Sequence, residues 1–340
     1  MKVLVTGGAG FIGSHTAVEL LQNGYDIIVV DNLSNSSKIV VDRIKELTNK
    51  DFSFYQCDVE DYEAMKKIFV ENKISTIIHF AGLKSNAESI EKPGLYLNVN
   101  IYSTYTLLRL MDEFEIKKMV FSSSATVYGT PDKVPDVETD LVGKVISPYG
   151  LTKYLNELLI KDFAVQRLDT KIIALRYFNP IGAHPSGLIG EDSTQQIPNN
   201  LVPYITKVML GQLPYLNVYG NSYKTIDGTG LRDYIHVVDL AQGHVAALNY
   251  LNKMPDNYDV FNLGTGKGIT VLQLVSAFEE ASGIKIPYKI VDIRPGDVPL
   301  SFAFVDKANK YLNWKTKLDY KECARDAWRW QKNNPNGYQK

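Results

Sequence analysis

Residues 2–13 read Lys-Val-Leu-Val-Thr-Gly-Gly-Ala-Gly-Phe-Ile-Gly, and this segment sets the fold class. Its first five residues predict a short β-strand, and residues 14–23 carry a helical apolar stripe that ends at Gly24. A glycine loop between a strand and a helix lets a pyrophosphate approach the backbone at the positive end of the helix. The pattern predicts a dinucleotide-binding turn; a tight turn without a ligand is the alternative. The predicted cofactor contacts are Gly7, Gly10, Phe11, Ile12 and Gly13.

An acidic residue follows this loop at the distance that a dinucleotide site requires. Residues 26–30 predict the second strand, and Asp31 lies 18 residues beyond Gly13, where a carboxylate binds the ribose hydroxyls. Residues 32–37 contain no arginine or lysine that could accept a 2′-phosphate, so the sequence predicts NAD and not NADP. The cofactor residues predicted in this segment are Asp31, Asn32, Leu33, Asn35 and Ser36.

Strands and helices continue to alternate along the first half of the chain. This order favours an α/β fold with a doubly wound parallel (Rossmann) sheet, whose ligands lie at the carboxyl ends of the strands. A helix is predicted at residues 62–71, and further strands at residues 52–56, 76–80, 117–122 and 171–177. Lys84 could face phosphates, although a solvated lysine is the commoner case. The predicted cofactor residues near these strand ends are Asp58, Val59, Phe80, Ala81, Lys84, Ser122 and Tyr177.

Hydroxyl and amine side chains gather around the predicted strand at 117–122. The strand runs into three serines that end with Ser124, and a helix is predicted to start after Ser147, its N-cap. Tyr149 and Lys153 are four residues apart, so they share one face of that helix, about 5–6 Å apart at Cβ. A tyrosine hydroxyl has a pKa of about 10, and an ammonium one turn away favours the phenolate.

A serine donor beside an activated tyrosine can remove a proton from a sugar or alcohol hydroxyl. The sequence therefore predicts Tyr149, Ser124 and Lys153 as catalytic residues. The alternative is chance, because a tyrosine four residues before a lysine occurs in many helices.

The second half of the chain has a different pattern. Residues 181–198 contain glycine and proline without apolar periodicity and predict a loop, and residues 199–211 predict a helix. Two turns carry Arg232 and Arg294, which suit a diphosphate, although a surface or salt-bridged arginine is the commoner case for each. We predict an NAD-binding domain at residues 1–180 and a smaller substrate-binding α/β domain at 181–340, with some segments returning to the first domain.

The composition excludes several other classes of protein. With 340 residues, 45% of them hydrophobic and 22% charged, the chain is typical of a soluble protein with two lobes. A net charge of −1 does not indicate the excess of positive charge that binds nucleic acid or an anionic membrane. No apolar run approaches the ~18 residues of a membrane span. The N-terminus predicts no secretory signal. Cys57, Cys323 and the five histidines lack ligand spacing, so we expect a cytoplasmic protein without a metal.

Several sequence blocks resemble the extended short-chain dehydrogenase/reductases and, within them, closely resemble the UDP-galactose 4-epimerases. The blocks lie at residues 7–15, 79–84, 121–129, 175–187, 197–201 and 232–237. The resemblance implies an NAD-dependent isomerase of galactose metabolism, active as a homodimer. It would interconvert UDP-glucose and UDP-galactose by removing the 4-hydroxyl proton and the carbon-4 hydride, then returning the hydride to the other face of a 4-keto sugar.

The resemblance also assigns site residues. Ser301 takes a position that borders the sugar pocket in the family, where a small residue accompanies acceptance of 2-acetamido sugars; the alternative is a solvated loop serine. The resemblance gives Asn98 to the cofactor, in a segment, 85–104, that departs from the family pattern, and Phe11 replaces a frequent tyrosine. The implied substrate residues are Ser124, Tyr149, Asn179, Asn200, Leu201, Asn217, Tyr219, Arg232, Arg294, Asp297 and Ser301.

Two other functions remain as alternatives. A nucleotide-sugar 4,6-dehydratase on this fold needs an Asp-Glu pair after the strand-end hydroxyl, whereas Ala125 and Thr126 follow Ser124. A non-catalytic NAD-sensing module would be expected to lose Tyr149 or Lys153, and both are present.

Overall fold

Seven parallel strands form the central sheet, in a computed structural model that describes residues 2–131, 133–167, 169–192, 198–294 and 297–338. The strand order is β11-β6-β5-β4-β1-β2-β3, and every neighbouring pair is parallel. The predicted doubly wound α/β sheet is confirmed. The strands are β1 (Lys2–Thr6), β2 (Asp26–Asp31), β3 (Ser53–Gln56), β4 (Ile74–His79), β5 (Lys118–Ser124), β6 (Lys171–Tyr177) and β11 (Tyr258–Leu263).

Helices cover both faces of this sheet, which explains why its central strands are apolar on both sides. Side chains alternate along β1, so Val3 and Val5 belong to one core and Leu4 to the other. The first core includes residues of α1 (Phe11–Gln22), α2 (Lys38–Thr48) and α8 (Val237–Tyr250). The second includes residues of α3 (Tyr62–Glu71), α5 (Pro93–Glu113) and α6 (Pro148–Val165).

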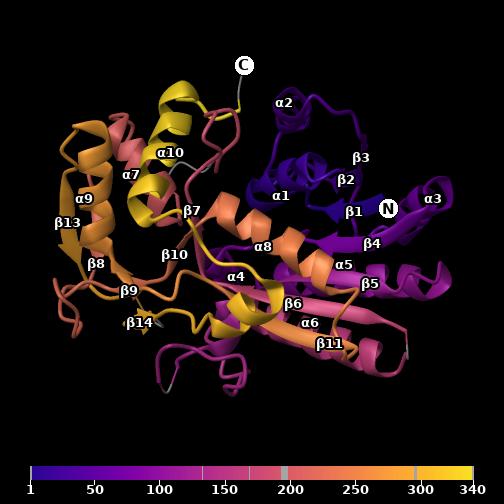
Figure 1. The fold of residues 1–340 in the computed structure, drawn as a ribbon. Coiled ribbons are helices and arrows are strands. Elements are labelled where there is room, and N and C mark those ends of the chain that lie inside the picture. The colour runs from indigo at the N-terminus through magenta and orange to yellow at the C-terminus, as the bar shows by residue number, and fades with distance from the viewer. Residues whose placement is uncertain (1, 132, 168, 193–197, 295–296, 339–340) are drawn as a thin grey trace.

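A second lobe follows residue 178 and has a core of its own (Figure 1). Helices α7 (Leu201–Met209), α9 (Val271–Ser282) and α10 (Tyr320–Asn333) contribute to that core. The predicted helix at 199–211 is thus present, and the described part of the predicted loop at 181–198 has no helix; residues 193–197 lie outside the description. Short strands pair as β7 (Asn179–Ile181) with β10 (Tyr234–His236), β8 (Leu216–Tyr219) with β13 (Tyr288–Val291), and β9 (Leu231–Arg232) between β12 (Ile269–Thr270) and β14 (Leu300–Ser301).

The chain returns to the first lobe after residue 236. Helix α8 packs on α1, and β11 pairs with β6 at the edge of the large sheet. The turn η2 (Ala308–Leu312) contacts both α8 and β11. Residues 237–263 therefore belong with the large sheet, although they follow the predicted boundary at 180.

Candidate active site

The three serines at the end of β5 each have a different partner. The Ser122 hydroxyl is hydrogen-bonded to the Tyr177 hydroxyl. Ser123 Oγ donates to Glu157 Oε1 at 2.5 Å. Ser124 Oγ accepts the backbone N–H of Thr126 at 3.2 Å and so caps the 3₁₀ helix η1 (Ala125–Tyr128). All three serines are buried, and β5 runs through them rather than ending at Ser122 as predicted.

Helix α6 brings Tyr149 and Lys153 to these serines, as the spacing predicts. Ser147 caps the helix by accepting the Gly150 N–H at 3.1 Å. Tyr149 is buried, and its phenol is hydrogen-bonded to Ser124. Lys153 Nζ lies 5.9 Å from the centre of the Tyr149 ring and donates to the Ser122 carbonyl oxygen at 2.7 Å. A serine, a tyrosine and a lysine therefore converge at the carboxyl end of a central strand.

Burial controls the ionisation of this group. It raises the pKa of Tyr149 to about 12, and the hydrogen bond with Ser124 opposes the rise. It lowers the pKa of Lys153 to about 8, and the Glu157 carboxylate opposes that fall. Burial therefore opposes the phenolate that the Tyr149–Lys153 spacing favours, because the loss of water around the phenol raises its pKa.

The glycine loop before α1 fits a dinucleotide diphosphate. Gly7 has φ of +68°, and a Cβ on Gly13 would lie 2.2 Å from the Gly7 carbonyl oxygen, so the turn requires glycine at both positions. Helix α1 begins at Phe11, earlier than predicted, and its N-cap Gly10 offers no side chain to the first-turn amides. The first turn also lacks an acidic residue. The first-turn amides are therefore not capped by a side chain, and no carboxylate there repels an anion. Free amides at the positive end of a helix can bind a diphosphate.

Asp31 ends β2 beside this loop. It is buried, and its carboxylate accepts the N–H of Ala9 at 3.0 Å, the N–H of Leu33 at 2.9 Å and the Ser36 hydroxyl at 2.8 Å. Asn35 is exposed in the same segment. The carboxylate thus ties the glycine loop to residues 31–36, as expected for a ribose-binding segment.

The segment after Asp31 also meets the end of β3. Asn32 Nδ2 donates to Asp58 Oδ1 at 2.6 Å, and Val59 next to Asp58 is buried. The predicted adenine-side residues therefore lie together.

The loop after β4 lies against the glycine loop. A Cβ on Gly7 would be 2.7 Å from the Ala81 nitrogen, and Phe80 precedes it. Asn100 of α5, which the sequence analysis missed, is buried and fixes this loop: it accepts the Leu83 N–H at 2.7 Å and donates to the Leu83 carbonyl at 3.0 Å.

Asn98, the residue predicted in this segment, lies on a different face of α5 from Asn100. Asn98 is exposed, on the face of α5 that carries Tyr102 and Tyr105 at helical spacing, whereas Asn100 shares the buried face with Ser103 and Thr104. The helical period of the buried residues could have identified Asn100.

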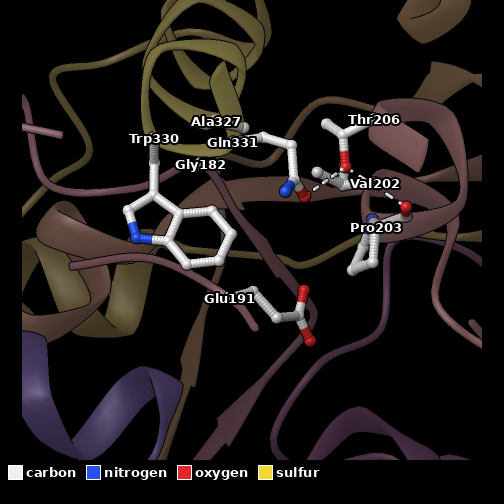
Figure 2. Close-up of a pocket in the computed structure, with 8 residues that line it drawn as sticks. All are labelled: Gly182, Glu191, Val202, Pro203, Thr206, Ala327, Trp330 and Gln331. Atoms are coloured by element: carbon white, nitrogen blue, oxygen red, sulfur yellow. Dashed lines mark hydrogen bonds between the residues drawn. The ribbon is translucent and has the colours of Figure 1, made fainter. Parts of the chain in front are cut away.

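Lys84 and Asn200 meet at one carboxylate that the sequence analysis also missed. Lys84 Nζ lies 2.9 Å from Glu191 Oε1, and Asn200 Nδ2 donates to the same oxygen at 2.8 Å. The contact joins a predicted cofactor residue to a predicted substrate residue. Glu191 also faces a hollow of about 10 Å³ beneath the Thr206–Gln331 hydrogen bond (Figure 2). That volume is about one water molecule, so no sugar nucleotide fits there.

The predicted substrate residues of the second lobe form one group across short strands. Arg232 lies in β9 rather than in a turn, and its Nη2 pairs with Asp297 Oδ1 at 2.5 Å. The Arg294 guanidinium carbon stacks 4.3 Å from the centre of the Tyr219 ring, and the turn after it includes residues 295–296, outside the description.

The remaining predicted substrate residues come from three elements of the second lobe. Asn217 is also on β8 and Leu201 is the first residue of α7. Asn179 begins β7 and is exposed. Strands β7 and β8 belong to separate short sheets.

Ser301 lies beside Arg232 in the pairing of β14 with β9. Its side chain is hydrogen-bonded to Asp136, a buried carboxyl whose pKa is raised to about 7, mainly by burial and secondarily by Asp140. Ser301 is half-buried in a strand and is not a solvated loop serine.

The described residues contain neither a metal-binding cluster nor a membrane-spanning helix. No group of three or more His, Cys, Asp or Glu side chains among them could hold a metal ion. Within the same residues, no helix combines the length and apolar composition that crossing a membrane requires.

Comparisons with known proteins agree with this geometry. The chain is 52% identical to UDP-glucose 4-epimerase 2 of Arabidopsis thaliana and 51% identical to UDP-glucose 4-epimerase of Bacillus subtilis, covering 99% of this chain and 97% and 99% of those proteins. A crystal structure of UDP-glucose 4-epimerase from Bifidobacterium longum in complex with NAD+ and UDP superposes with a TM-score of 0.95 at 48% identity, covering 99% of this chain and 100% of that one. The sequence profile of the NAD dependent epimerase/dehydratase family matches residues 3–264. The resemblance noted in the sequence is therefore confirmed, and the chain belongs to the NAD-dependent epimerase/dehydratase family.

Proposed function

We propose that this protein interconverts UDP-glucose and UDP-galactose by reversible epimerisation at carbon 4, with NAD as cofactor. The observation that carries the proposal is the convergence of Ser124, Tyr149 and Lys153 at the carboxyl end of β5, where Lys153 Nζ lies 5.9 Å from the Tyr149 ring centre. In a doubly wound sheet this edge is where ligands bind. Relatives that share about half of their residues with this chain over nearly the full length are named UDP-glucose 4-epimerase.

The reaction assigns a separate task to each of these side chains. Tyr149 takes the proton from the sugar 4-hydroxyl and returns it to the same oxygen when carbon 4 is reduced from its opposite face. Ser124 hydrogen-bonds that oxygen, and Lys153 supplies positive charge that favours the Tyr149 phenolate. The hydride chemistry, uptake from carbon 4 and return to the opposite face of the 4-keto sugar, would be supplied by bound NAD. Because burial excludes water from Tyr149, the proton moves between the phenol and the sugar rather than to solvent.

NAD would be held by groups at the carboxyl ends of six strands, β1 to β6, and by Lys153 of α6. The glycine loop and the first turn of α1 would receive the diphosphate, and Asp31 the ribose hydroxyls. The nicotinamide end would lie near Lys153, Ser122 and Tyr177. The remainder of the cofactor would lie along the segments 31–36, 58–59 and 80–84. The buried Asp31 carboxylate supports this order, because it already orients the loop through Ala9.

The UDP-sugar would bind between the lobes. The Arg232–Asp297 pair and the stacked Arg294 and Tyr219 provide cationic and aromatic groups of the kind that bind a diphosphate and a base. Asn179, Asn200, Leu201 and Asn217 would line the remainder. This assignment rests on the resemblance and on the common position of these residues in the second lobe.

A direct experiment tests the activity. Purified protein is incubated with UDP-galactose, and the product sugar is identified while absorbance in the reduced-nicotinamide band is followed. We expect UDP-glucose and a transient rise in that band. A dehydrated 6-deoxy product would indicate a dehydratase, and unchanged UDP-galactose would indicate a binding module.

We further propose that the protein also accepts the UDP-linked 2-acetamido sugars. Ser301 is small, and its hydroxyl is engaged by Asp136, so its side chain leaves room beside β9. A bulky side chain at position 301 would collide with the acetamido group, and accommodating both would cost about 1–3 kcal/mol of strain. The test compares UDP-N-acetylglucosamine with UDP-glucose on the wild type and on Ser301→Tyr. We expect Ser301→Tyr to lose the first activity and keep the second; a wild type without the first activity would contradict the proposal.

Two further properties belong to this proposal. The protein would be a homodimer, because neighbouring helices α5 and α6 expose large apolar side chains together: Leu95, Leu97, Tyr102, Tyr105, Leu158, Leu159 and Val165. An exposed apolar patch of this kind marks an interface in a soluble protein. A cytoplasmic location would suit the two free thiols, Cys57 and Cys323.

A further inference from the structure

A buried ion pair lies one helical turn beyond Lys153. Glu157 of α6 and Arg176 of β6 each expose about 5% of their side chains. Arg176 Nε donates to Glu157 Oε1 at 2.9 Å and Nη2 donates to Oε2 at 2.6 Å, so the contact is bidentate. A buried pair with this geometry holds two elements in one fixed arrangement, here the helix of Tyr149 and the strand next to β5.

The same carboxylate also holds the end of β5. Ser123 Oγ donates to Glu157 Oε1 at 2.5 Å, while Lys153 Nζ donates to the carbonyl oxygen of the preceding residue, Ser122, at 2.7 Å. Helix α6 is thus attached to two successive residues of the strand, and the next residue is Ser124. Any rotation of α6 that moved Tyr149 away from Ser124 would break both contacts.

We propose that Glu157 is a positioning residue of this active site: it fixes the end of β5 against α6 and so holds Tyr149 at Ser124 and Lys153 at the Ser122 carbonyl oxygen. Tyr149, Lys153 and Glu157 follow one another at intervals of four residues, so all three lie on one helix face. The inference rests on the roles proposed above for Tyr149 and Lys153. Those roles do not by themselves require a carboxylate at this position.

The charges around Lys153 leave Glu157 as its source of negative charge. His79 of β4 is buried, and burial lowers its pKa to about 3, so its imidazole is neutral. Arg176 is positive, and it binds the Glu157 carboxylate through two hydrogen bonds. The other titratable groups around this segment are Tyr149, His79, Tyr177 and Tyr258, and Glu138 and Asp259 act in turn on Arg176 and Tyr258. Of these carboxylates, Glu157 is the one that raises the pKa of Lys153.

Glu157→Gln tests the proposal, because glutamine keeps the size and can still accept from Ser123 but carries no charge. We expect kcat to fall about 10- to 100-fold with KM nearly unchanged, as for a small displacement of reacting groups. We also expect the alkaline limb of the kcat–pH profile to move down by about one pH unit, since an ammonium without its carboxylate deprotonates earlier. The Lys153 Nζ resonance, assigned in ¹⁵N-lysine NMR by its loss in Lys153→Met, should titrate at correspondingly lower pH.

Two variants separate positioning from simple structural support. Ser123→Ala removes the strand contact without unpairing a charge, and it should lower kcat several-fold without moving the alkaline limb. Tyr128→Phe is the matched control: Tyr128 shares Arg176, whose Nη1 donates to its hydroxyl at 3.2 Å, but it does not touch Glu157. Tyr128→Phe should change neither the alkaline limb nor the Lys153 titration.

The outcomes are distinct. The proposal is overturned by a folded Glu157→Gln protein with wild-type kcat and an unmoved alkaline limb, or by an equal shift in Tyr128→Phe. If Glu157→Gln does not fold, Ser123→Ala decides: reduced kcat supports the proposal and unchanged kcat overturns it. Wild-type turnover in Tyr149→Phe would instead contradict the proposed function itself, which this inference needs.

Discussion

Tyr149 is the side chain on which the proposed chemistry depends most directly. Its ring is buried between Ser124 and Tyr96, so phenylalanine fills the same space and removes one hydroxyl. We expect Tyr149→Phe to keep the fold and the bound NAD but to lose turnover by about 10²–10⁴-fold, the usual cost of removing a general base. Initial rates with UDP-galactose, together with nucleotide content and a melting curve, measure this. Rates like those of the wild type would assign the proton transfer to another group.

Asp31 links the glycine loop to the cofactor segment, so its removal should affect NAD retention rather than the chemical step. Asp31→Ala loses an acceptor for the ribose hydroxyls and the contact with Ala9. We expect weaker binding by roughly 1.5–3 kcal/mol, typical of a charged hydrogen bond. Nucleotide content after gel filtration measures it. Asp51→Ala is the control, because Asp51 is 86% exposed and lies outside the site; equal NAD content in both variants would contradict the assignment.

Asp136 joins two elements that approach the sugar side of the site. Its N–H donates to the Phe302 carbonyl at 2.9 Å and its carbonyl accepts the Phe304 N–H at 2.8 Å, so the segment before α6 is clamped to the chain just after β14. The buried carboxyl adds the contact with Ser301. The position of Ser301 therefore depends on a loop more than 150 residues earlier in the chain.

Burial of the Asp136 carboxyl predicts a pH dependence of stability. The pKa of Asp136 is raised from its ordinary 3.8 to about 7, so between these values the folded protein holds a proton that the unfolded chain has lost. This contribution is therefore complete below about pH 4 and disappears as the pH rises through 7. Asp136→Asn cannot lose that proton, so we expect it to match the wild type near pH 4 and to be more stable at pH 8, on the order of 1–3 kcal/mol. Melting temperatures at both pH values measure this, and a constant difference between the two proteins would contradict it.

Local patterns predicted the elements of this fold, but not the contacts between distant ones. The glycine loop, Asp31 and the Tyr149–Lys153 spacing depend on residues close in sequence, and the structure places all of them at the carboxyl edge of the sheet. The pairing of Glu157 with Arg176 depends on how α6 lies on β6, which no short pattern contains.

Two properties of the site depend on burial, which no short pattern contains. Asn98 and Asn100 differ in which face of α5 is buried, and the sequence analysis named only the exposed one. The pKa of Tyr149 depends on how much water the folded chain leaves around the phenol, whereas the spacing to Lys153 gives only the nearest charge.

The two lobes have separate cores, yet contacts between them surround the proposed site. Lys84 of the first lobe pairs with Glu191 of the second, and Asp136 binds Ser301. Strand β11 and helix α8 also bring the chain back from the second lobe to the large sheet (Figure 1). The chain crosses between the lobes more than once, and polar contacts join them close to the reacting groups. Both features fix the relative position of the lobes. A substrate bound between them would meet side chains from both.

The apolar face of α5 and α6 predicts the assembly of the whole molecule. Leu159 on α6 is 42% exposed beside Tyr102 and Tyr105 of α5, and a second copy of this face would cover these side chains. We expect the wild type to be a dimer, and Leu159→Glu to sediment near the monomer mass of 38.2 kDa, because a charge buried without a partner opposes association. Val70→Glu is the control, since Val70 is 68% exposed on α3, which contributes no residue to this patch, and should leave the dimer intact. Analytical ultracentrifugation of the three proteins decides it: a monomeric wild type, or a Leu159→Glu protein as dimeric as Val70→Glu, would show that α5 and α6 do not form the interface.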